Sequence, residues 1–151
     1  MAGSVEAWGR LGVPAEDAWA RHLGIEMLEV TPSRVRARLD AGPRHHQPMG
    51  ILNGGVWCSI VETVASYGAG VAALTRGQKG VVGIANSTDF LRSHSAGELL
   101  AEGTPLHVGR SQQLWEVRIA RGSDGVLVAR GQVRFHVLDE LPAERAARGG
   151  A

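Results

Sequence analysis

The chain has 151 residues, 44% of them hydrophobic and 21% charged, a composition typical of one globular domain that buries its own core. Its formal charge of +1 and scattered arginines argue against a nucleic-acid partner, since such a face concentrates positive charge. Cys58 is the only cysteine, which excludes an internal disulfide and a thiolate-rich metal site, and with no signal-peptide or membrane-spanning pattern we expect a soluble cytoplasmic protein.

The first predicted elements are a short helix and a hairpin. Residues 14–17 place a proline and two acids at a helix start, and Gly24 ends that helix. Residues 25–30 and 34–39 tend to alternate apolar and polar side chains, with Thr31-Pro32-Ser33 between them. This pattern predicts two strands joined by a turn.

A long helix follows a loop. Residues 41–50 are rich in proline, glycine and histidine, which favour a loop. The apolar run from about residue 54 to 75 predicts a helix that ends in the glycine-rich segment 76–80.

The second half of the chain reads as strands. Gly122-Ser123-Asp124-Gly125 predicts a hairpin turn between the last two of them. The four strand candidates are residues 81–91, 98–107, 112–121 and 126–137.

The end of the chain contains alanine, arginine and glycine without an apolar period. We therefore predict one domain over residues 1–141, with an N-terminal helical segment over 1–23, and a flexible tail over 142–151.

Two features of the long helix indicate carbonyl chemistry. Gly54 and Gly55 at its start leave backbone N–H groups uncovered at the positive end of the helix dipole, where they can bind a developing negative charge. Glu62 is the only carboxylate in the run, and its neighbours Ile60, Val61, Val64 and Ala65 are apolar. A helical glutamate usually lies on a solvated face, so an acid among apolar residues is a candidate for function.

One long apolar helix among about six antiparallel strands predicts an α+β hotdog fold, in which a curved sheet wraps a central helix. Residues 47–55, with Glu62 eight positions beyond Gly54, resemble the hotdog-fold acyl-CoA thioesterases. Within them the chain is most similar to the aromatic acyl-CoA branch, such as 4-hydroxybenzoyl-CoA, 1,4-dihydroxy-2-naphthoyl-CoA and phenylacetic-acid-degradation thioesterases. The resemblance extends through residues 81–83, 89–93 and 105–111 and covers roughly residues 20–138.

The resemblance implies roles in thioester hydrolysis. The Gly54 amide would polarise the carbonyl, and Glu62 would act as nucleophile or general base, which the sequence leaves open. Gln47 matches a position whose amide lies close to the reacting group, and Thr63 and Ser66 are candidates to hold Glu62 or the attacking water. Asn53 stands where most relatives have histidine; it can cap the helix, and we expect catalysis to survive at a lower rate.

The resemblance also implies a groove for coenzyme A, with Arg92 and Arg110 as the phosphate-binding candidates. Coenzyme A is then part of the substrate, and no cofactor is expected. No metal is expected either, because His45-His46 lacks further ligands at a suitable spacing. The full set of candidate substrate-binding residues is Gly83, Phe90, Leu91, Arg92, Ser93, His107, Val108, Gly109, Arg110, Ser111 and Gln112.

Helix geometry predicts a shared site. Gly54 and Glu62 are eight residues apart, or about 12 Å along a helix axis, so both cannot reach one carbonyl. A homodimer that combines Gly54 of one subunit with Glu62 of the other resolves this, and the family resemblance adds a homotetramer.

Two other functions stay open. A hotdog hydratase or dehydratase would use the same fold, but it usually pairs an acid with the histidine that is missing at position 53. A non-catalytic acyl-CoA binding protein would keep the arginine groove without hydrolysis.

Overall fold

The central element is the helix α3, Gly54–Thr75, which has the bounds that the sequence predicts. We describe it from a computed structural model that covers residues 17–149. By length and composition α3 could cross a membrane, with a mean hydropathy of 1.2 over 18 residues, but 67% of that window is buried inside the protein. The helix is therefore the core of the domain.

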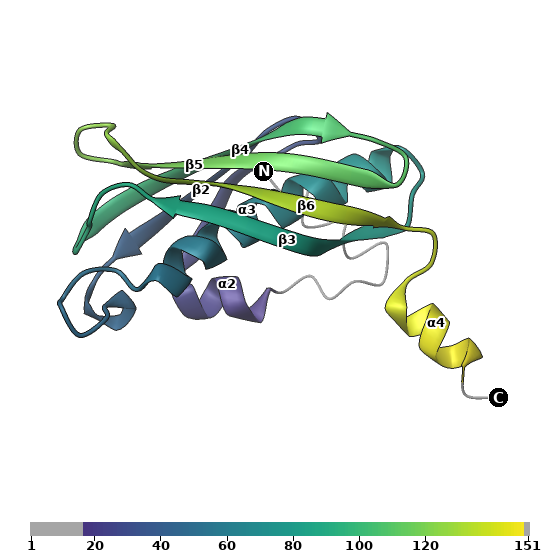
Figure 1. The fold of residues 1–151 in the computed structure, drawn as a ribbon, viewed down its shortest axis with the longest axis horizontal. Coiled ribbons are helices and arrows are strands. Elements are labelled where there is room, and N and C mark those ends of the chain that lie inside the picture. The colour runs from purple at the N-terminus through teal and green to yellow at the C-terminus, as the bar shows by residue number, and fades with distance from the viewer. Residues whose placement is uncertain (1–16, 150–151) are drawn as a thin grey trace.

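Six antiparallel strands curl over one side of α3 in the order β1-β2-β4-β5-β6-β3, which leaves β1 and β3 at the two edges (Figure 1). This arrangement confirms the predicted α+β hotdog fold. The strand ends lie within two residues of the predicted ranges: β1 Ile25–Val30, β2 Val35–Ala41, β3 Gly80–Phe90, β4 Gly97–Val108, β5 Gln112–Arg121 and β6 Leu127–Leu138.

The sheet packs on α3 through alternate side chains, as the period of two requires. Val133, Phe135 and Val137 of β6 are buried, and the residues between them are exposed. Two polar groups also enter this core: Trp115 Nε1 donates to Gln113 Oε1 at 2.9 Å, and Gln113 Nε2 donates to the Ala69 carbonyl of α3 at 3.1 Å. Because these polar groups are paired, burying them carries little penalty.

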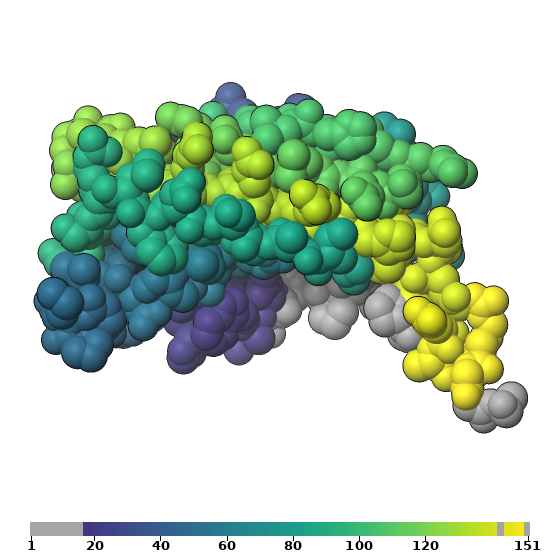
Figure 2. Space-filling model, viewed as in Figure 1, coloured from purple at the N-terminus to yellow at the C-terminus, as the bar shows by residue number. Residues whose placement is uncertain are grey.

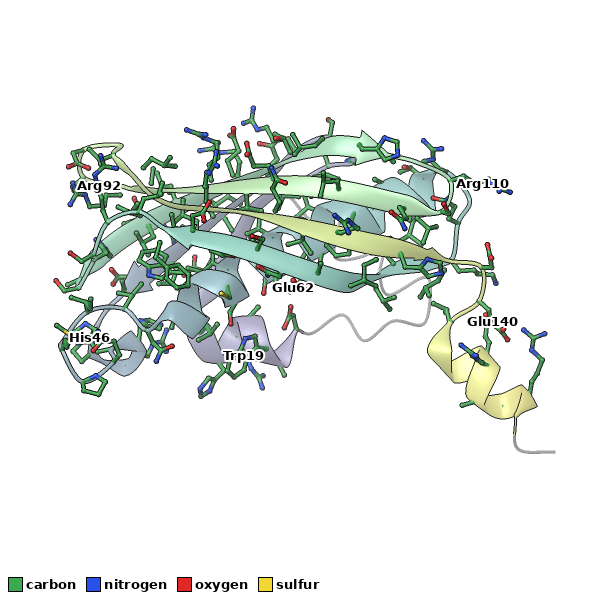
Figure 3. The ribbon with its side chains drawn as sticks, in the orientation of Figure 1. Trp19, His46, Glu62, Arg92, Arg110 and Glu140 are labelled. Atoms are coloured by element: carbon green, nitrogen blue, oxygen red, sulfur yellow. The ribbon has the colours of Figure 1, made fainter. Side chains whose placement is uncertain are left out.

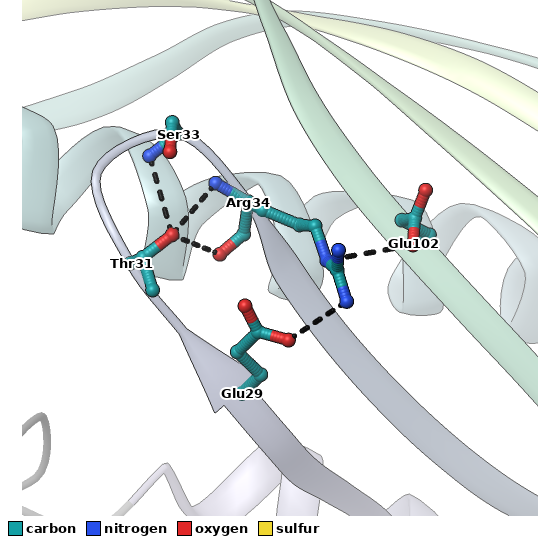
Figure 4. Close-up of polar contacts among 5 residues, drawn as sticks. All are labelled: Glu29, Thr31, Ser33, Arg34 and Glu102. Atoms are coloured by element: carbon teal, nitrogen blue, oxygen red, sulfur yellow. Dashed lines mark hydrogen bonds and ion pairs between the residues drawn. The ribbon is translucent and has the colours of Figure 1, made fainter.

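The first turn is the one predicted at Thr31-Pro32-Ser33. Thr31 Oγ1 donates to the Arg34 carbonyl at 2.8 Å and accepts from the Arg34 N–H at 2.9 Å, which closes the chain between β1 and β2 (Figure 4). The Arg34 guanidinium then reaches Glu29 on β1 at 3.0 Å and Glu102 on β4 at 3.6 Å. The turn is thereby tied to three neighbouring strands.

The turn between β5 and β6 also lies where the sequence predicts it. Gly125 has a φ of 69°, which favours glycine. Asp124 accepts from the Val126 N–H at 3.1 Å and from Arg121 at 2.8 Å. The Val126 N–H first, and Arg121 second, hold the pKa of the Asp124 carboxyl below its usual value.

The short helix α2, Ala18–Leu23, begins after Asp17, whose side chain accepts from the Ala20 N–H at 2.9 Å. It ends at Gly24 with a φ of 77°, as predicted. Residues 14–16 of the predicted helix start lie outside the described residues. The predicted loop over residues 41–50 contains a short 3-10 helix, Pro43–His45.

Residues 142–148, which lie in the segment expected to be a flexible tail, form the helix α4, Pro142–Arg148. Its first turn is held by Glu144, which accepts from the Leu141 N–H at 3.0 Å and pairs with Lys79 at 3.4 Å. Arg148 pairs with Glu140. These contacts are polar, and a search for apolar periodicity does not detect them. The sequence analysis therefore did not predict this helix.

Gly68 should be the position in α3 least able to accept a side chain. A methyl group there would lie 2.3 Å from a ring carbon of the fully buried Trp115. We expect Gly68→Ala to lower the melting temperature by several degrees, because overpacking costs about 1–3 kcal/mol and outweighs the helix propensity gained. Gly42→Ala, where the added methyl has no neighbour within 4 Å, is the control. Equal melting temperatures in calorimetry would contradict this.

Candidate active site

Glu62 lies in the middle of α3, half-buried, on the side of the helix that faces β3 (Figure 3). Its Oε2 accepts a hydrogen bond from Asn86 Nδ2 of β3 at 2.8 Å. Sequence reasoning did not single out Asn86. The isolated Gly83 in the same strand was the available signal, because glycine inside a strand often marks a bulge.

A hollow of about 400 Å³ opens beside the Glu62 carboxylate. Trp19 forms one wall of this hollow from α2, and its Nε1 donates to Ser59 Oγ at 3.0 Å. Ser59 in turn donates to the Gly55 carbonyl at 2.7 Å, so α2 is fastened to the first turn of α3. Trp57, in the first turn of α3, is buried in the core and does not line the hollow. The residues that line the hollow are Trp19, Cys58, Ser59, Glu62, Thr63 and Asn86.

Gly83 lies directly against the carboxylate. A methyl group on Gly83 would be 2.4 Å from Glu62 Oε1, so only a residue without a side chain leaves this oxygen its space. The sequence analysis placed Gly83 among the candidate substrate-binding residues. The structure gives it Glu62 as its neighbour.

The start of α3 exposes a free donor. Asn53 is the N-cap, as predicted, and its Oδ1 accepts from the Gly55 N–H at 2.7 Å. Within residues 17–149 no hydrogen bond is found for the Gly54 N–H. The phenyl ring of Phe90 lies over Gly54, since a methyl group there would be 2.8 Å from a ring carbon. An N–H that has no hydrogen-bond partner among the described residues, at the positive end of a 22-residue helix, suits a developing oxyanion.

Gly54 and Glu62 are therefore next to different ends of the edge strand. Gly54 is under Phe90, the last residue of β3, whereas Glu62 is against Gly83 near its first residue. Most of β3 is exposed, and its side chains run uncovered between α2 and β6 (teal in Figure 2). Within one chain the acid and the N–H do not converge on one point.

The other predicted catalytic residues are less directly engaged. Gln47 lies in the loop before α3, where its side chain accepts from the Met49 N–H and its carbonyl from the Gly50 N–H at 2.9 Å. Thr63 is buried beside the hollow, and Ser66 is one turn beyond Glu62. In the described part of the chain neither hydroxyl is hydrogen-bonded to Glu62, whose partner is Asn86.

The two candidate phosphate-binding arginines lie at opposite ends of the sheet (Figure 3). Arg92 follows β3 and donates to the Leu127 carbonyl at 2.8 Å. Arg110 lies in the turn between β4 and β5, and its carbonyl accepts from Gln78, just before β3 begins, at 2.9 Å. One chain therefore does not bring both guanidinium groups to one ligand.

The remaining substrate-binding candidates fall into the same two groups. Phe90, Leu91 and Ser93 accompany Arg92 at the end of β3. The second group surrounds the tight β4–β5 turn, which the Gly109 N–H closes on the Gln112 carbonyl at 2.8 Å, and it comprises His107, Val108, Gly109, Arg110, Ser111 and Gln112.

Tyr67 and the pair His45-His46 complete the electrostatic description. Burial, and to a smaller extent Asp17, raises the pKa of the Tyr67 phenol, which is therefore neutral at pH 7. The histidine pair does not converge, because His45 Nε2 bonds to the Leu23 carbonyl and His46 Nε2 to the Ser95 carbonyl. Across residues 17–149 no group of three or more histidine, cysteine or acidic side chains could hold a metal ion.

Comparison with known proteins gives a family match. Residues 49–128, more than half of the chain, match the family described as the thioesterase superfamily. The Rv1847 protein of Mycobacterium tuberculosis, which carries a provisional esterase name, is 45% identical over 121 residues, covering 80% of this chain and 86% of that protein. Its solved structure superposes with a TM-score of 0.79 at 40% identity, covering 83% of this chain and all of the other.

Two relatives have more specific names. The proofreading thioesterase EntH of Klebsiella pneumoniae is 34% identical over 117 residues, covering 74% of this chain and 84% of EntH. The 1,4-dihydroxy-2-naphthoyl-CoA thioesterase 2 of Arabidopsis thaliana is 41% identical over 98 residues, covering 64% of this chain and 60% of the relative.

Proposed function

The chain belongs to the thioesterase superfamily, and from that membership and the site geometry we propose that it hydrolyses an acyl-CoA thioester to a free acid and coenzyme A. The observation that carries the proposal is the carboxylate of Glu62, which borders an open hollow and is the only acid in a largely apolar helix. Glu62 is half-buried and has no cationic partner among the described residues, so a reaction that uses it is the simplest reason for its presence.

The chemistry needs two groups at the thioester. The Gly54 N–H stabilises the negative charge that forms on the carbonyl oxygen, as a preorganised donor worth about 10²–10³ in rate. Glu62 either takes a proton from water while the water oxygen adds to the carbonyl carbon, or adds itself to give an anhydride that water then cleaves. In both routes the C–S bond breaks, and the sulfur leaves with the bonding electrons and takes up a proton. Water is the second reactant, and we propose no cofactor or metal.

The two groups would meet across a dimer. If β3 of one subunit pairs antiparallel with β3 of a second, about a two-fold axis near Asn86, the end of each strand lies beside the start of the other. The partner's Gly54, under the partner's Phe90, would then approach Glu62 beside Gly83. Each dimer would contain two equivalent sites.

The same pairing would assemble the coenzyme A groove. Arg92 follows the end of β3, and Arg110 lies close to the start of β3. In the antiparallel pair, Arg92 of one subunit would therefore lie near Arg110 of the other. Two arginines from different subunits could then share the phosphates, to which guanidinium groups bind bidentately.

An uncovered edge strand supports this pairing. Among residues 17–149, β3 has a hydrogen-bonded strand only on the β6 side. The exposed apolar residues on or next to β3 are Val82, Ile84, Phe90 and Leu91. Such an edge favours another strand. We propose a homodimer that pairs again into a homotetramer. We also propose that the protein works in the cytoplasm, where a free cysteine such as Cys58 stays reduced.

We further propose an aromatic acyl group. Trp19 is the aromatic residue that lines the hollow, it is 56% exposed, and its hydrogen bond to Ser59 fixes the plane of the indole. An exposed ring held in place beside the catalytic acid suits a flat, apolar partner. The name of the Arabidopsis relative, a naphthoyl-CoA thioesterase, points in the same direction.

Glu62→Gln should lower kcat for benzoyl-CoA at least about 100-fold, because an amide can neither attack nor take a proton. Release of the thiol, followed with a thiol-reactive dye, measures this, and the melting temperature controls for folding. Unchanged turnover would contradict the proposal. In the native protein, tight binding of benzoyl-CoA without release would identify a binding protein. With an enoyl-CoA as substrate, loss of the acyl-chain double bond would identify a hydratase.

A mixture of two inactive variants should recover activity if the site is shared. Gly54→Pro removes the N–H at a position where helices accept proline, and Glu62→Gln removes the acid. A heterodimer of the two then has one site with neither change, so a random mixture should reach about one quarter of the native rate. Mass spectrometry confirms that heterodimers form. Their presence without activity would show that each site lies within one chain.

Trp19→Leu should reduce the preference for aromatic substrates. The ratio of kcat/KM for benzoyl-CoA to that for hexanoyl-CoA is expected to fall about 2- to 10-fold, the worth of one aromatic contact. Trp19→Phe, which keeps a ring but loses the bond to Ser59, is the matched control and should retain most of the ratio. A ratio unchanged in Trp19→Leu would exclude Trp19 from substrate recognition.

A further inference from the structure

The Glu62 carboxylate is held through only one of its two oxygens. Asn86 Nδ2 donates to Oε2 at 2.8 Å, and the same nitrogen donates to the Cys58 carbonyl, one turn earlier in α3, at 3.2 Å. Both protons of the amide are thus directed at the helix. Oε1 has no hydrogen bond within the described residues and lies beside the bare Cα of Gly83.

Two acceptors decide which way the Asn86 amide points, because the Glu62 carboxylate and the Cys58 carbonyl both need the nitrogen to face them. Thr88 Oγ1 then donates to Asn86 Oδ1 at 2.7 Å, so the oxygen of the amide is also held. Were the amide reversed, its oxygen would meet the carboxylate and the Cys58 carbonyl, two acceptors. The chain Thr88, Asn86, Glu62 therefore has one direction.

A β-bulge brings this amide to the helix. In the ladder with β6, Gly83 is opposite Phe135 but Ala85 is opposite Arg134, so Ile84 is an extra residue in β3. Opposed residues share a face, and accordingly Gly83 pairs with the buried Phe135 and Asn86 with the buried Val133. In a regular strand Gly83 and Asn86, three residues apart, would point to opposite faces. The bulge puts both against Glu62.

We propose that Asn86, whose amide oxygen is held by Thr88, is a positioning residue that holds Glu62 through Oε2 and leaves Oε1 as the oxygen that reacts. This inference rests on the proposed thioester hydrolysis. An amide suits the task because it donates to the ionised carboxylate and has no charge or titration of its own. Gly83 completes the arrangement by leaving Oε1 room for the water or the thioester carbon.

The electrostatic surroundings of Glu62 are simple. Besides Glu62 itself, Cys58 of α3 is the one titratable side chain among the residues that line the hollow, and β3 and α2 contribute Asn86 and Trp19, which do not ionise. The donated hydrogen bond from Asn86 is therefore the polar contact within the described residues that holds the Glu62 carboxylate in place.

Four variants test the proposal with benzoyl-CoA as substrate. Asn86→Ala should lower kcat about 10- to 100-fold with KM changed less than about threefold, because the lost bond aligns the acid and does not bind coenzyme A. Asn86→Asp places a second carboxylate beside Glu62 and should move the acidic limb of the pH profile of kcat/KM upward by about one pH unit or more. Thr88→Val should lower kcat in the same direction, and Thr88→Ser, which keeps the hydroxyl, should restore it.

Gln132→Ala is the control for loss of an amide from the neighbouring strand, since Gln132 is exposed on the outer face of the sheet. It should keep native kinetics. Native kcat in Asn86→Ala, or a pH profile unmoved in Asn86→Asp, would overturn the role of Asn86.

Glu62→Gln separates this failure from failure of the proposed function. If that variant is inactive while Asn86→Ala is fully active, hydrolysis by Glu62 stands and only the positioning role falls. If Glu62→Gln turns over at the native rate, both fall.

Discussion

The structure depends on one constraint on the helix α3. Its apolar sides must be covered by the sheet, whereas its single acid, Glu62, must stay accessible to solvent. The sheet curls round α3 and buries side chains in every turn of it, from Val56 to Ala73. Glu62 is not covered by apolar side chains because it faces the edge strand β3. There the chain supplies the amide of Asn86 and the bare backbone of Gly83. A charged group is tolerated there since it keeps a hydrogen bond and access to solvent.

The edge strand is where local irregularity and function coincide. A bulge costs regular pairing and is kept where it directs a side chain to a useful place. Here it changes the side on which Asn86 lies, so that strand β3 presents Gly83 and Asn86 together to the helix. The same strand is open on its other side, with exposed apolar residues along it. One strand thus supplies both the support for the acid and the surface on which we expect a second subunit to pair.

The fold was largely predictable from the chain, because its signals are local. Asn53 and the glycines give the start of α3, Gly24 ends α2, and alternation along β6 marks the face that packs on the helix. The catalytic candidates Glu62 and Gly54 were also visible, since an acid in an apolar run and a bare helix start are sequence features. The helix α4 was not predicted, because Glu144 holds it through a backbone cap and an ion pair, and neither contact produces an apolar period in the sequence.

What the sequence determined by itself is the set of elements and the chemistry that each offers, because propensity, capping and periodicity act over a few residues. What only the tertiary structure decided is which groups meet. Asn86 reaches Glu62 because of one extra residue in a strand ladder, Trp19 reaches the hollow because α2 packs on α3, and Arg92 and Arg110 separate because they follow opposite ends of the sheet. Register and packing join residues that are dozens of positions apart, and no local pattern encodes such a distance.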